Sequence, residues 1–305
     1  MATITEPIKG GFSTRVAELS IDYFEIESDI VGARFAVSVS LPSTGYGTGP
    51  LPVVYALDAQ WHGGGYEKMH DALTKNEAVR PVQPYVQVNV GYTMDEGDEA
   101  IGIRNRDLVP AGESFPDGFA DYLRDHLGRD GEPAPADKLE RFFAYMADAR
   151  ADDFLAFLET ELHPVVAERY EVRSEDAGLF GFSYGGLFAL HALTAGSTLF
   201  SRFGAGSPGI LVEESTIFAA YEEFAARNGG SERARRLHIT VADNEMFGPI
   251  RLYRLLGIET ARFYHLVCEK PVPGLETTIE VIRGEDHESG TLDAYRSFIR
   301  TCYAV

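Results

Sequence analysis

A serine between glycines is the strongest chemical signal in the sequence. Ser183 lies in G-F-S-Y-G at residues 181–185, and the G-x-S-x-G pattern occurs only once in the chain. A serine hydroxyl becomes a useful nucleophile when it is exposed and a neighbouring base takes its proton. The apolar run 177–182 precedes the motif and the apolar segment 187–195 follows it, which predicts a strand, a nucleophile elbow and a helix. The alternative is a glycine-rich turn without chemistry.

His287 is the histidine best placed to act as the base. It lies in R-G-E-D-H-E-S-G, a polar loop at residues 283–290 between the last strand candidate and the last helix candidate. In α/β hydrolases the chain order is serine, acid, histidine, and His287 follows Ser183 as this order requires. The alternative is a solvated surface histidine. The other histidines are expected to be structural or to lie too early in the chain: His62, His70, His126, His163, His191, His238 and His265.

The acid that orients the histidine should follow the strand candidate at residues 237–242. Asp243 and Glu245 both lie there, in V-A-D-N-E. Such an acid holds the imidazole in the correct tautomer and stabilises the imidazolium. Asp286, next to the histidine, is a third candidate, and a Ser–His pair without an acid is a further alternative.

The helix predicted after Ser183 supplies a second chemical element. Its N-terminus directs backbone N–H groups and a partial positive charge at a reacting carbonyl oxygen, so the Tyr184 N–H is the expected first oxyanion donor. Serine chemistry of this kind needs no cofactor, and none is expected. The sequence contains no H-E-x-x-H and no paired C-x-x-C, so no metal site is expected either.

The elements that must position these residues alternate between strand and helix. Residues 24–42 predict two antiparallel strands joined by a tight connection, and the apolar runs that follow predict buried parallel strands. Helical periodicity marks the stretches between them, including 151–170 with its internal Pro164. We therefore predict an α/β-hydrolase fold: a mostly parallel central sheet with an N-terminal antiparallel hairpin and helices on both faces.

One domain over residues 1–305 is expected, with a lid-like insertion at about 93–150. This segment is rich in charge, glycine and proline, and it shows helical patches at 119–127 and 138–146 but no strong strand. Long irregular segments of compact enzymes often cover the substrate. Disorder is the alternative.

Composition limits the class of partner. The formal net charge is −20, which argues against non-specific binding to nucleic acids and to anionic membrane surfaces. Residues 1–15 lack the apolar core of a secretion signal, and no apolar run is long enough to span a bilayer. The two cysteines, Cys268 and Cys302, form no disulfide framework, so we expect a cytoplasmic protein. The oligomeric state is not indicated.

Taken together, the motifs resemble the putative esterase family of α/β hydrolases, and within it the enterochelin (siderophore trilactone) esterases. The stretch G-F-S-Y-G-G-L-F-A-L at 181–190 resembles G-H-S-Y-G-G-L-F-x-L, the most specific of the matching segments. R-N-R-D-L-V-P at 104–110 resembles R-x-R-D-L-T-P, and G-E-D-H-E-S at 284–289 resembles a loop with G-x-x-H-x-S. The resemblance covers most of the chain.

This resemblance implies roles for particular residues. Ser183 and His287 carry over as nucleophile and base, and A-D-N-E at 242–245 is similar to a G-x-x-E segment, which favours Glu245 as the acid over Asp243. The second oxyanion N–H should come from Ala59 or Gln60. Arg104 matches a substrate-facing position; the alternative is a salt bridge with Asp107 or another carboxylate.

The sequence also departs from the family pattern. Phe182 replaces the usual histidine before the serine, and Ala59 replaces the glycine of L-D-G. H-G-G-G at 62–65 begins four residues after Asp58, so we expect a flexible loop that borders the pocket rather than an oxyanion hole. Trp61, the only tryptophan, is either a pocket wall or a packing residue.

The expected function is hydrolysis of a small-molecule ester, such as a siderophore-type lactone or a small acyl ester. Two alternatives use the same fold. One is acyl transfer to an alcohol, or amide or thioester hydrolysis, at the same serine. The other is a catalytically inactive member that binds a ligand.

Overall fold

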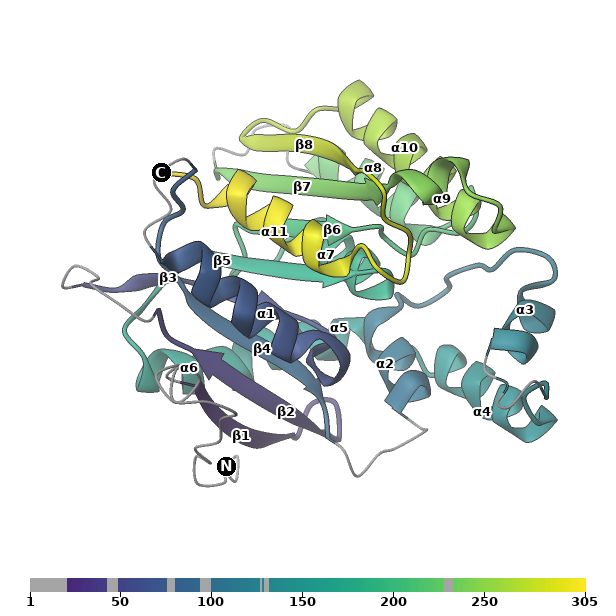
Figure 1. Ribbon diagram of the computed structural model, residues 1–305, viewed down its shortest axis with the longest axis horizontal. Coiled ribbons are helices and arrows are strands. Elements are labelled where there is room, and N and C mark those ends of the chain that lie inside the picture. The colour runs from purple at the N-terminus through teal and green to yellow at the C-terminus, as the bar shows by residue number, and fades with distance from the viewer. Residues whose placement is uncertain are drawn as a thin grey trace.

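A single eight-stranded sheet organises the chain (Figure 1). The structure, a computed structural model, describes residues 21–42, 49–75, 80–93, 100–126, 128, 132–227 and 233–305. The expectation about a secretion signal concerns residues 1–15, which lie outside these ranges. None of the helices in the described ranges combines enough length with enough apolar character to cross a membrane.

The strand order confirms the predicted sheet. Strands follow one another across it as β1-β2-β4-β3-β5-β6-β7-β8. The pairs β1–β2 and β2–β4 are antiparallel and the remaining pairs are parallel. The strands are β1 (Ile21–Ser28), β2 (Ala33–Ser40), β3 (Leu51–Ala56), β4 (Val86–Tyr92), β5 (Val172–Phe182), β6 (Arg202–Gly206), β7 (Arg235–Ala242) and β8 (Leu275–Ile282).

Helices cover both faces of the sheet, as predicted. Helices α1 and α11 lie side by side on one face, and α5, α6, α7 and α8 lie on the other (Figure 1). These helices bury both sides of the central parallel strands β3, β6 and β7, whereas the edge strand β8 stays partly exposed. The helices are α1 (Ala59–Thr74), α2 (Ala100–Leu108), α3 (Phe119–His126), α4 (Ala136–Ala147), α5 (Ala151–Phe157), the π-helix η3 (Leu158–Leu162), α6 (His163–Arg169), α7 (Tyr184–Ala195), α8 (Thr216–Arg227), α9 (Asp243–Phe247), α10 (Arg251–Glu269) and α11 (Thr291–Cys302).

Two apolar cores lie on the two faces. The larger one joins the N-terminal strands to the helices around α7, and Phe35, Phe157 and Phe188 are fully buried in it. The smaller one lies under α1 and α11 and contains Tyr66, Phe180 and Phe298. Strand β5 contributes to both, because its successive side chains point to opposite faces. The strand that leads to Ser183 is therefore fixed from two sides.

The helix expected at 151–170 is divided. A π-helical turn at Leu158–Leu162 separates α5 from α6, and Pro164 occupies the first turn of α6. Proline is tolerated there because the first helical N–H groups have no intrahelical acceptor.

The segment at 93–150 contains three helices in its described parts. Helices α3 and α4 match the helical patches of the sequence, while α2 was not predicted. All three lie beyond the carboxyl ends of the parallel strands (Figure 1). A third apolar cluster, which includes Phe119, Leu139 and Phe142, joins α3 and α4 to Tyr253 and Leu256 of α10.

Candidate active site

Ser183 lies at a sharp turn between β5 and α7. Its backbone has φ 58° and ψ −123°, an unusual conformation for a residue with a side chain. The Ser183 N–H donates to the Gly206 carbonyl at 2.9 Å, and its own carbonyl accepts from Gly209 N–H at 2.8 Å. A Cβ at Gly181 would lie only 2.1 Å from the Gly185 carbonyl oxygen. The glycine at 181 is thus required by the close approach within the elbow.

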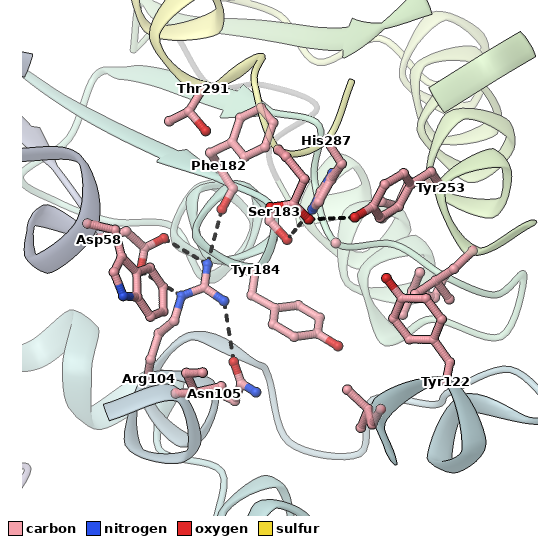
Figure 2. A pocket seen from close by; sticks show the side chains of 18 of the residues that line it. Asp58, Arg104, Asn105, Tyr122, Phe182, Ser183, Tyr184, Tyr253, His287 and Thr291 are labelled. Carbon is pink, nitrogen blue, oxygen red and sulfur yellow. Dashed lines mark hydrogen bonds and ion pairs between the residues drawn. The ribbon is translucent and has the colours of Figure 1, made fainter. Parts of the chain in front are cut away.

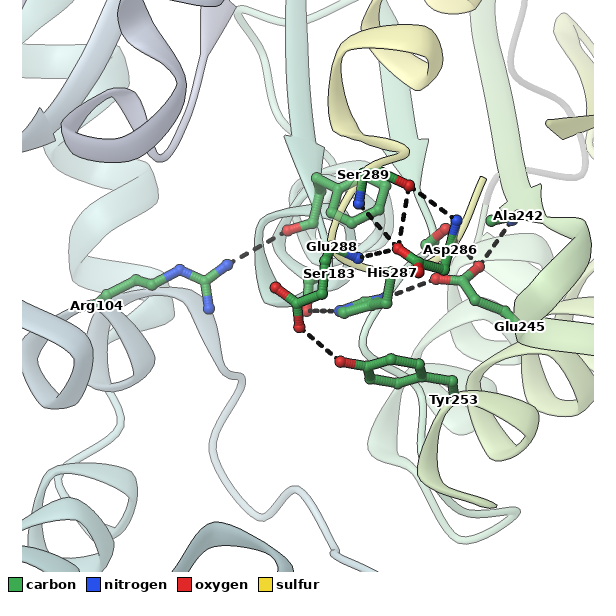
Figure 3. A network of polar contacts seen from close by, with 11 residues as sticks. Arg104, Ser183, Ala242, Glu245, Tyr253, Asp286, His287, Glu288 and Ser289 are labelled. Carbon is green, nitrogen blue, oxygen red and sulfur yellow. Dashed lines mark hydrogen bonds and ion pairs between the residues drawn. The ribbon is translucent and has the colours of Figure 1, made fainter. Parts of the chain in front are cut away.

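The structure brings Ser183 and His287 together. His287 Nε2 lies 2.9 Å from Ser183 Oγ, although the two residues are 104 positions apart (Figure 3). The loop that carries His287 connects β8 to α11, so the sheet fixes its starting point. This distance lies within hydrogen-bond reach, which a general base requires.

Of the three acid candidates, Glu245 is the one in contact with the imidazole. Glu245 Oε1 lies 2.6 Å from His287 Nδ1, and the carboxylate is fully buried at the start of α9. Its Oε2 accepts from Ser207 O–H at 2.7 Å and from Ala242 N–H at 2.8 Å. These two donors satisfy a charge that would otherwise be costly to bury.

The other two candidates have different partners. Asp243 Oδ1 accepts from the Gly284 N–H at 2.9 Å and so fastens the histidine loop to the start of α9. Asp286 Oδ1 accepts from the backbone N–H groups of Glu288 and Ser289, each at 3.0 Å. The Ser289 hydrogen bonds lower the pKa of Asp286. Both aspartates shape the loop without touching the imidazole.

Two aromatic rings flank the imidazole. Phe182 lies on one side, with its ring centroid 5.1 Å from that of His287, and Tyr253 of α10 lies at 5.0 Å. The Tyr253 hydroxyl donates to Glu288 at 2.5 Å. Phe182, the departure next to the serine, thus forms a wall for the base.

The candidate oxyanion donors lie at two helix N-termini. Tyr184 is the first residue of α7 and Ala59 and Gln60 are the first two of α1, so their N–H groups lack intrahelical acceptors. The Gln60 backbone packs closely against Gly91 of β4: a Cβ at position 91 would lie 2.6 Å from the Gln60 nitrogen. Asp58 precedes these residues in a left-handed conformation, with φ 61°.

Arg104 is engaged in a buried salt bridge. Its Nε and one terminal nitrogen contact the two carboxylate oxygens of Asp58 at 2.6 and 2.7 Å (Figure 2). The same terminal nitrogen donates to the Phe182 carbonyl at 3.3 Å. Burial alone would lower the pKa of Arg104, but the attraction of Asp58 outweighs it and the pKa is raised.

The partner of Arg104 is therefore Asp58, which confirms the alternative of a salt bridge with a carboxylate other than Asp107. Asp107 is held by Arg106 at 2.7 Å. The guanidinium of Arg104 also lies over two rings, 5.4 Å from the Trp61 centroid and 5.6 Å from that of Tyr184. Arg104 thus links α2, the turn after β3 and the elbow in one contact network.

A cavity of about 350 Å³ opens above the serine. Its lining combines the Ser183–His287 pair with residues of the 93–150 segment and of α10 (Figure 2). Most of this lining is apolar or aromatic. Trp61 and Arg104 both belong to it, so Trp61 forms part of the pocket wall and is 49% exposed.

Residues 62–65 are helical, which corrects the expectation of a flexible loop. They form part of α1, and His62 lines the cavity. Burial lowers the pKa of His62. Gly65 packs directly against α11, because an added Cβ would lie 2.7 Å from Leu292. Close helix packing is the physical reason for glycine at this position.

The other histidines whose side chains the structure describes have structural partners or lie outside the site. His70 contacts the Tyr85 carbonyl at 2.9 Å, and His238 lies between Thr278 and Ser297. His191 contacts Asp152 at 2.9 Å, and the exposed His265 pairs with Glu269 on its own helix. Among the described residues, no cluster of three or more histidine, cysteine or acidic side chains could hold a metal ion.

Sequence reasoning missed four residues of the site. The sequence analysis gave no role to the side chains of four residues that take part in the site's hydrogen-bond network: Asp58, Ser207, Tyr253 and Glu288. Asp58 offered a weak signal, since it lies at the carboxyl end of β3, where α/β sheets place ligand-binding residues. Tyr253 offered none, because helix α10 reaches the site only through tertiary packing.

Several known proteins are similar to this chain in sequence. A family described as Putative esterase matches residues 137–251. The ferri-bacillibactin esterase BesA of Bacillus subtilis is 24% identical over 222 residues, which cover 73% of this chain and 70% of that protein. The siderophore enterobactin esterase of Emericella nidulans is 30% identical over 157 residues, 50% of this chain and 46% of that protein.

Solved structures share the fold. The BES protein from Bacillus cereus superposes with a TM-score of 0.74 at 18% identity and covers 99% of both chains. The siderophore hydrolase EstB from Aspergillus nidulans gives 0.72 at 19% identity over 98% of each chain. The protein is therefore an ester hydrolase of the α/β-hydrolase fold that resembles the putative esterase family and its siderophore esterases.

Proposed function

We propose that Ser183, His287 and Glu245 form a catalytic triad that hydrolyses an ester through an acyl-enzyme on Ser183. The observation that carries this proposal is the chain of hydrogen bonds from Ser183 Oγ to His287 Nε2 and from His287 Nδ1 to the buried Glu245. It lies at the base of a cavity large enough for a small ligand.

The reaction proceeds in two acyl-transfer steps. His287 Nε2 accepts the Ser183 proton while Oγ attacks the ester carbonyl, and it then protonates the leaving alkoxide. A water molecule activated by the same nitrogen hydrolyses the acyl-enzyme. For Nε2 to accept the proton, Nδ1 must carry hydrogen, and the Glu245 carboxylate at 2.6 Å favours that tautomer.

Backbone N–H groups stabilise the oxyanion of the tetrahedral intermediate. Tyr184 supplies one at the N-terminus of α7, and Ala59 or Gln60 supplies the other at the N-terminus of α1. Loss of one such donor costs roughly 10²–10³-fold in kcat in comparable sites. The buried Arg104–Asp58 pair connects these two helix starts and so keeps their separation constant.

The segment 93–150 acts as a lid within one domain over residues 1–305. Helices α2, α3 and α4 contribute Ile101, Phe119, Tyr122, Leu123 and Phe142 to the lining of the cavity. An apolar cover of this kind excludes water from the oxyanion and strengthens every polar contact beneath it.

The proposed substrate is a siderophore-type lactone or another small acyl ester. Proteins similar to this chain carry siderophore esterase names, and the cavity volume suits a small molecule. No nucleic-acid or membrane partner is proposed, because the strong negative charge opposes both. A cytoplasmic location stays a prediction from the sequence.

A covalent serine probe tests the triad. A fluorophosphonate should label the wild-type protein at Ser183, and Ser183→Ala should lose the label and about 10⁵–10⁶-fold in kcat on aryl esters. Ser38→Ala is the matched control, because Ser38 lies on β2 and bonds to Glu67. An unlabelled wild type would favour the inactive, ligand-binding alternative.

Product analysis separates hydrolysis from acyl transfer. In water without an added alcohol, the rate of free-acid release should equal the rate at which the ester's own alcohol is released. Adding a primary alcohol at millimolar concentration should leave the acid as the main product. A dominant new ester would instead indicate an acyltransferase.

A further inference from the structure

The charges that face the cavity are unbalanced. Among the described residues that line it, three carry a formal charge: Asp58, Arg104 and Glu288. The guanidinium of Arg104 is almost fully buried and bonds to both carboxylate oxygens of Asp58. This pair neutralises itself, so its cation is not available to a carboxylate or phosphate of a substrate.

Glu288 remains as an uncompensated negative charge. It follows His287 directly, and its side chain lies beside Ser183 in the cavity (Figure 3). The partner that contacts its carboxylate is the neutral hydroxyl of Tyr253, at 2.5 Å. This hydrogen bond points the carboxylate into the cavity without cancelling its charge.

The influence of Glu288 reaches the lid. Burial raises the pKa of Tyr122 on α3, and the negative charge of Glu288 adds to that rise. The same charge acts on His62 of α1, where it opposes the effect of burial. A substrate in the cavity would lie between these groups and within reach of the same field.

The rest of the lining offers no compensation. The remaining walls are largely aromatic or aliphatic, with Trp61, Phe142 and Leu256 on three different helices. The whole chain adds a formal net charge of −20, which repels anions at longer range.

We infer that the cavity selects uncharged or cationic esters over anionic ones, and that Glu288 is the residue that determines this specificity. The inference rests on the proposed esterase function at Ser183 and narrows its substrate class. Glu288 is solvent-exposed at the edge of the cavity, and Tyr253 holds its carboxylate there. An anionic group of the substrate has to approach this like charge, and no cation in the described lining is free to offset it.

A nearly isosteric pair of substrates tests the inference. 4-Butyryloxybenzamide and 4-butyryloxybenzoate share the acyl group and differ in one charge on the leaving group. Wild type should show a lower kcat/KM for the anionic ester by about fivefold to tenfold, after correction for their rates with hydroxide. Glu288→Gln should raise the ratio of anionic to neutral kcat/KM by a similar factor.

Two control variants test whether the effect comes from the charge of Glu288, from its hydrogen bond with Tyr253 or from the net charge of the protein. Tyr253→Phe removes the hydrogen bond but keeps the carboxylate, so the charge discrimination should persist. Glu285→Gln removes the same charge from the same loop outside the cavity lining, and its ratio should stay near that of wild type. An unchanged ratio in Glu288→Gln, or a wild type that prefers the benzoate, would overturn the inference.

The proposed function fails in a different way. If fluorophosphonate does not label Ser183 and neither ester is turned over, the triad proposal is wrong and the specificity falls with it. If both esters are hydrolysed through Ser183 at equal corrected rates, the triad stands and only the role of Glu288 is refuted.

Discussion

Ser183 is exposed to the cavity because its neighbours allow an unusual backbone. A non-glycine residue at φ 58° and ψ −123° is strained by roughly 1–3 kcal/mol, and the hydrogen bonds to Gly206 and Gly209 hold it there. The sharp turn also explains the glycine at 181, because it brings the Gly185 carbonyl so close that a side chain at 181 would collide with it. The reactive hydroxyl therefore depends on residues that perform no chemistry.

The choice of acid can be tested by an isosteric pair of variants. Glu245→Gln should reduce kcat by about 10³–10⁴-fold, because an amide no longer stabilises the imidazolium or fixes its tautomer. Asp243→Asn keeps an acceptor for the Gly284 N–H and should lose less than about tenfold. Steady-state kinetics on an aryl ester measure both. Equal losses of kcat in the two variants would show that the 2.6 Å contact between Glu245 and His287 does not identify the catalytic acid.

The Arg104–Asp58 pair is expected to act by positioning. Arg104→Met leaves the buried Asp58 carboxylate without its cationic partner, which should lower the free energy of unfolding by about 3–5 kcal/mol. The double variant Arg104→Met/Asp58→Asn removes both charges and should recover part of that loss. Urea unfolding gives the stabilities, and Arg124→Met, which removes an exposed ion pair with Asp121, is the control for loss of an arginine. A fully additive double variant would contradict a coupled pair.

Among single residues, the sequence predicted the proposed catalytic residues better than the residues that hold them in position. Ser183, His287 and the elbow glycines follow a pattern of residue types at fixed spacing. Asp58 could not be assigned, because its role depends on Arg104 from a helix 46 positions later in the chain. A bidentate pair of this kind has no local signature.

Among the elements, α1 shows how tertiary packing overrides propensity. Three successive glycines at 63–65 disfavour a helix by their conformational entropy, so a loop was the natural expectation. The structure instead places them in a helix that packs on β4 and α11. Packing against α11 stabilises this glycine-rich helix. The two helices approach so closely that a side chain at Gly65 would have no room.

This packing predicts opposite outcomes for two adjacent glycines. At Gly64 an added Cβ meets nothing within 4 Å, so Gly64→Ala should stabilise the protein by about 0.5–1 kcal/mol. At Gly65 the same Cβ would lie 2.7 Å from Leu292, so Gly65→Ala should be the less stable of the two. Thermal unfolding of the pair measures the difference. Equal stabilisation would show that α1 and α11 separate easily.

Helix α4 offers a matched pair for the lid. Phe142 lines the cavity, whereas the adjacent Phe143 lies outside its lining. Phe142→Ala should raise KM for a neutral aryl ester roughly tenfold, because a buried aromatic surface against the substrate is lost. Phe143→Ala should change KM much less, although both variants lose some stability. The same rise in KM for both would argue against a lid that contacts the substrate.

For the whole molecule, the alternation of strands and helices predicted the sheet and its covered faces. Apolar runs such as those at β3 and β4 require burial on both sides, which a parallel sheet with helices on each face provides. The arrangement of α2, α3 and α4 was less predictable. The apolar faces of α3 and α4 pack on α10, from a distant part of the chain, and sequence periodicity does not name a packing partner.

Two buried histidines make the stability of the whole molecule depend on pH. Burial lowers the pKa of His70 and of His238 from 6.5 to about 4. The unfolded chain therefore binds more protons between these values, and stability is fully present above about pH 6.5 and is lost as the pH falls towards 4. Each histidine contributes at most about 3 kcal/mol over that range. Buried carboxylates with raised pKa values, such as Glu113, act in the opposite direction.

The contribution of one histidine can be isolated by comparison with a variant. His238→Gln keeps hydrogen-bonding capacity towards Thr278 and Ser297 but cannot take up a proton. It should be less stable than wild type at pH 7, and the difference should shrink steadily between pH 6.5 and 4, because only wild type must protonate a buried ring on acidification. Urea unfolding at half-unit pH steps gives both curves. A difference in stability that stays constant with pH would mean that His238 takes up a proton in the folded protein at little cost. That result would contradict the effect expected from its burial between β7, β8 and α11.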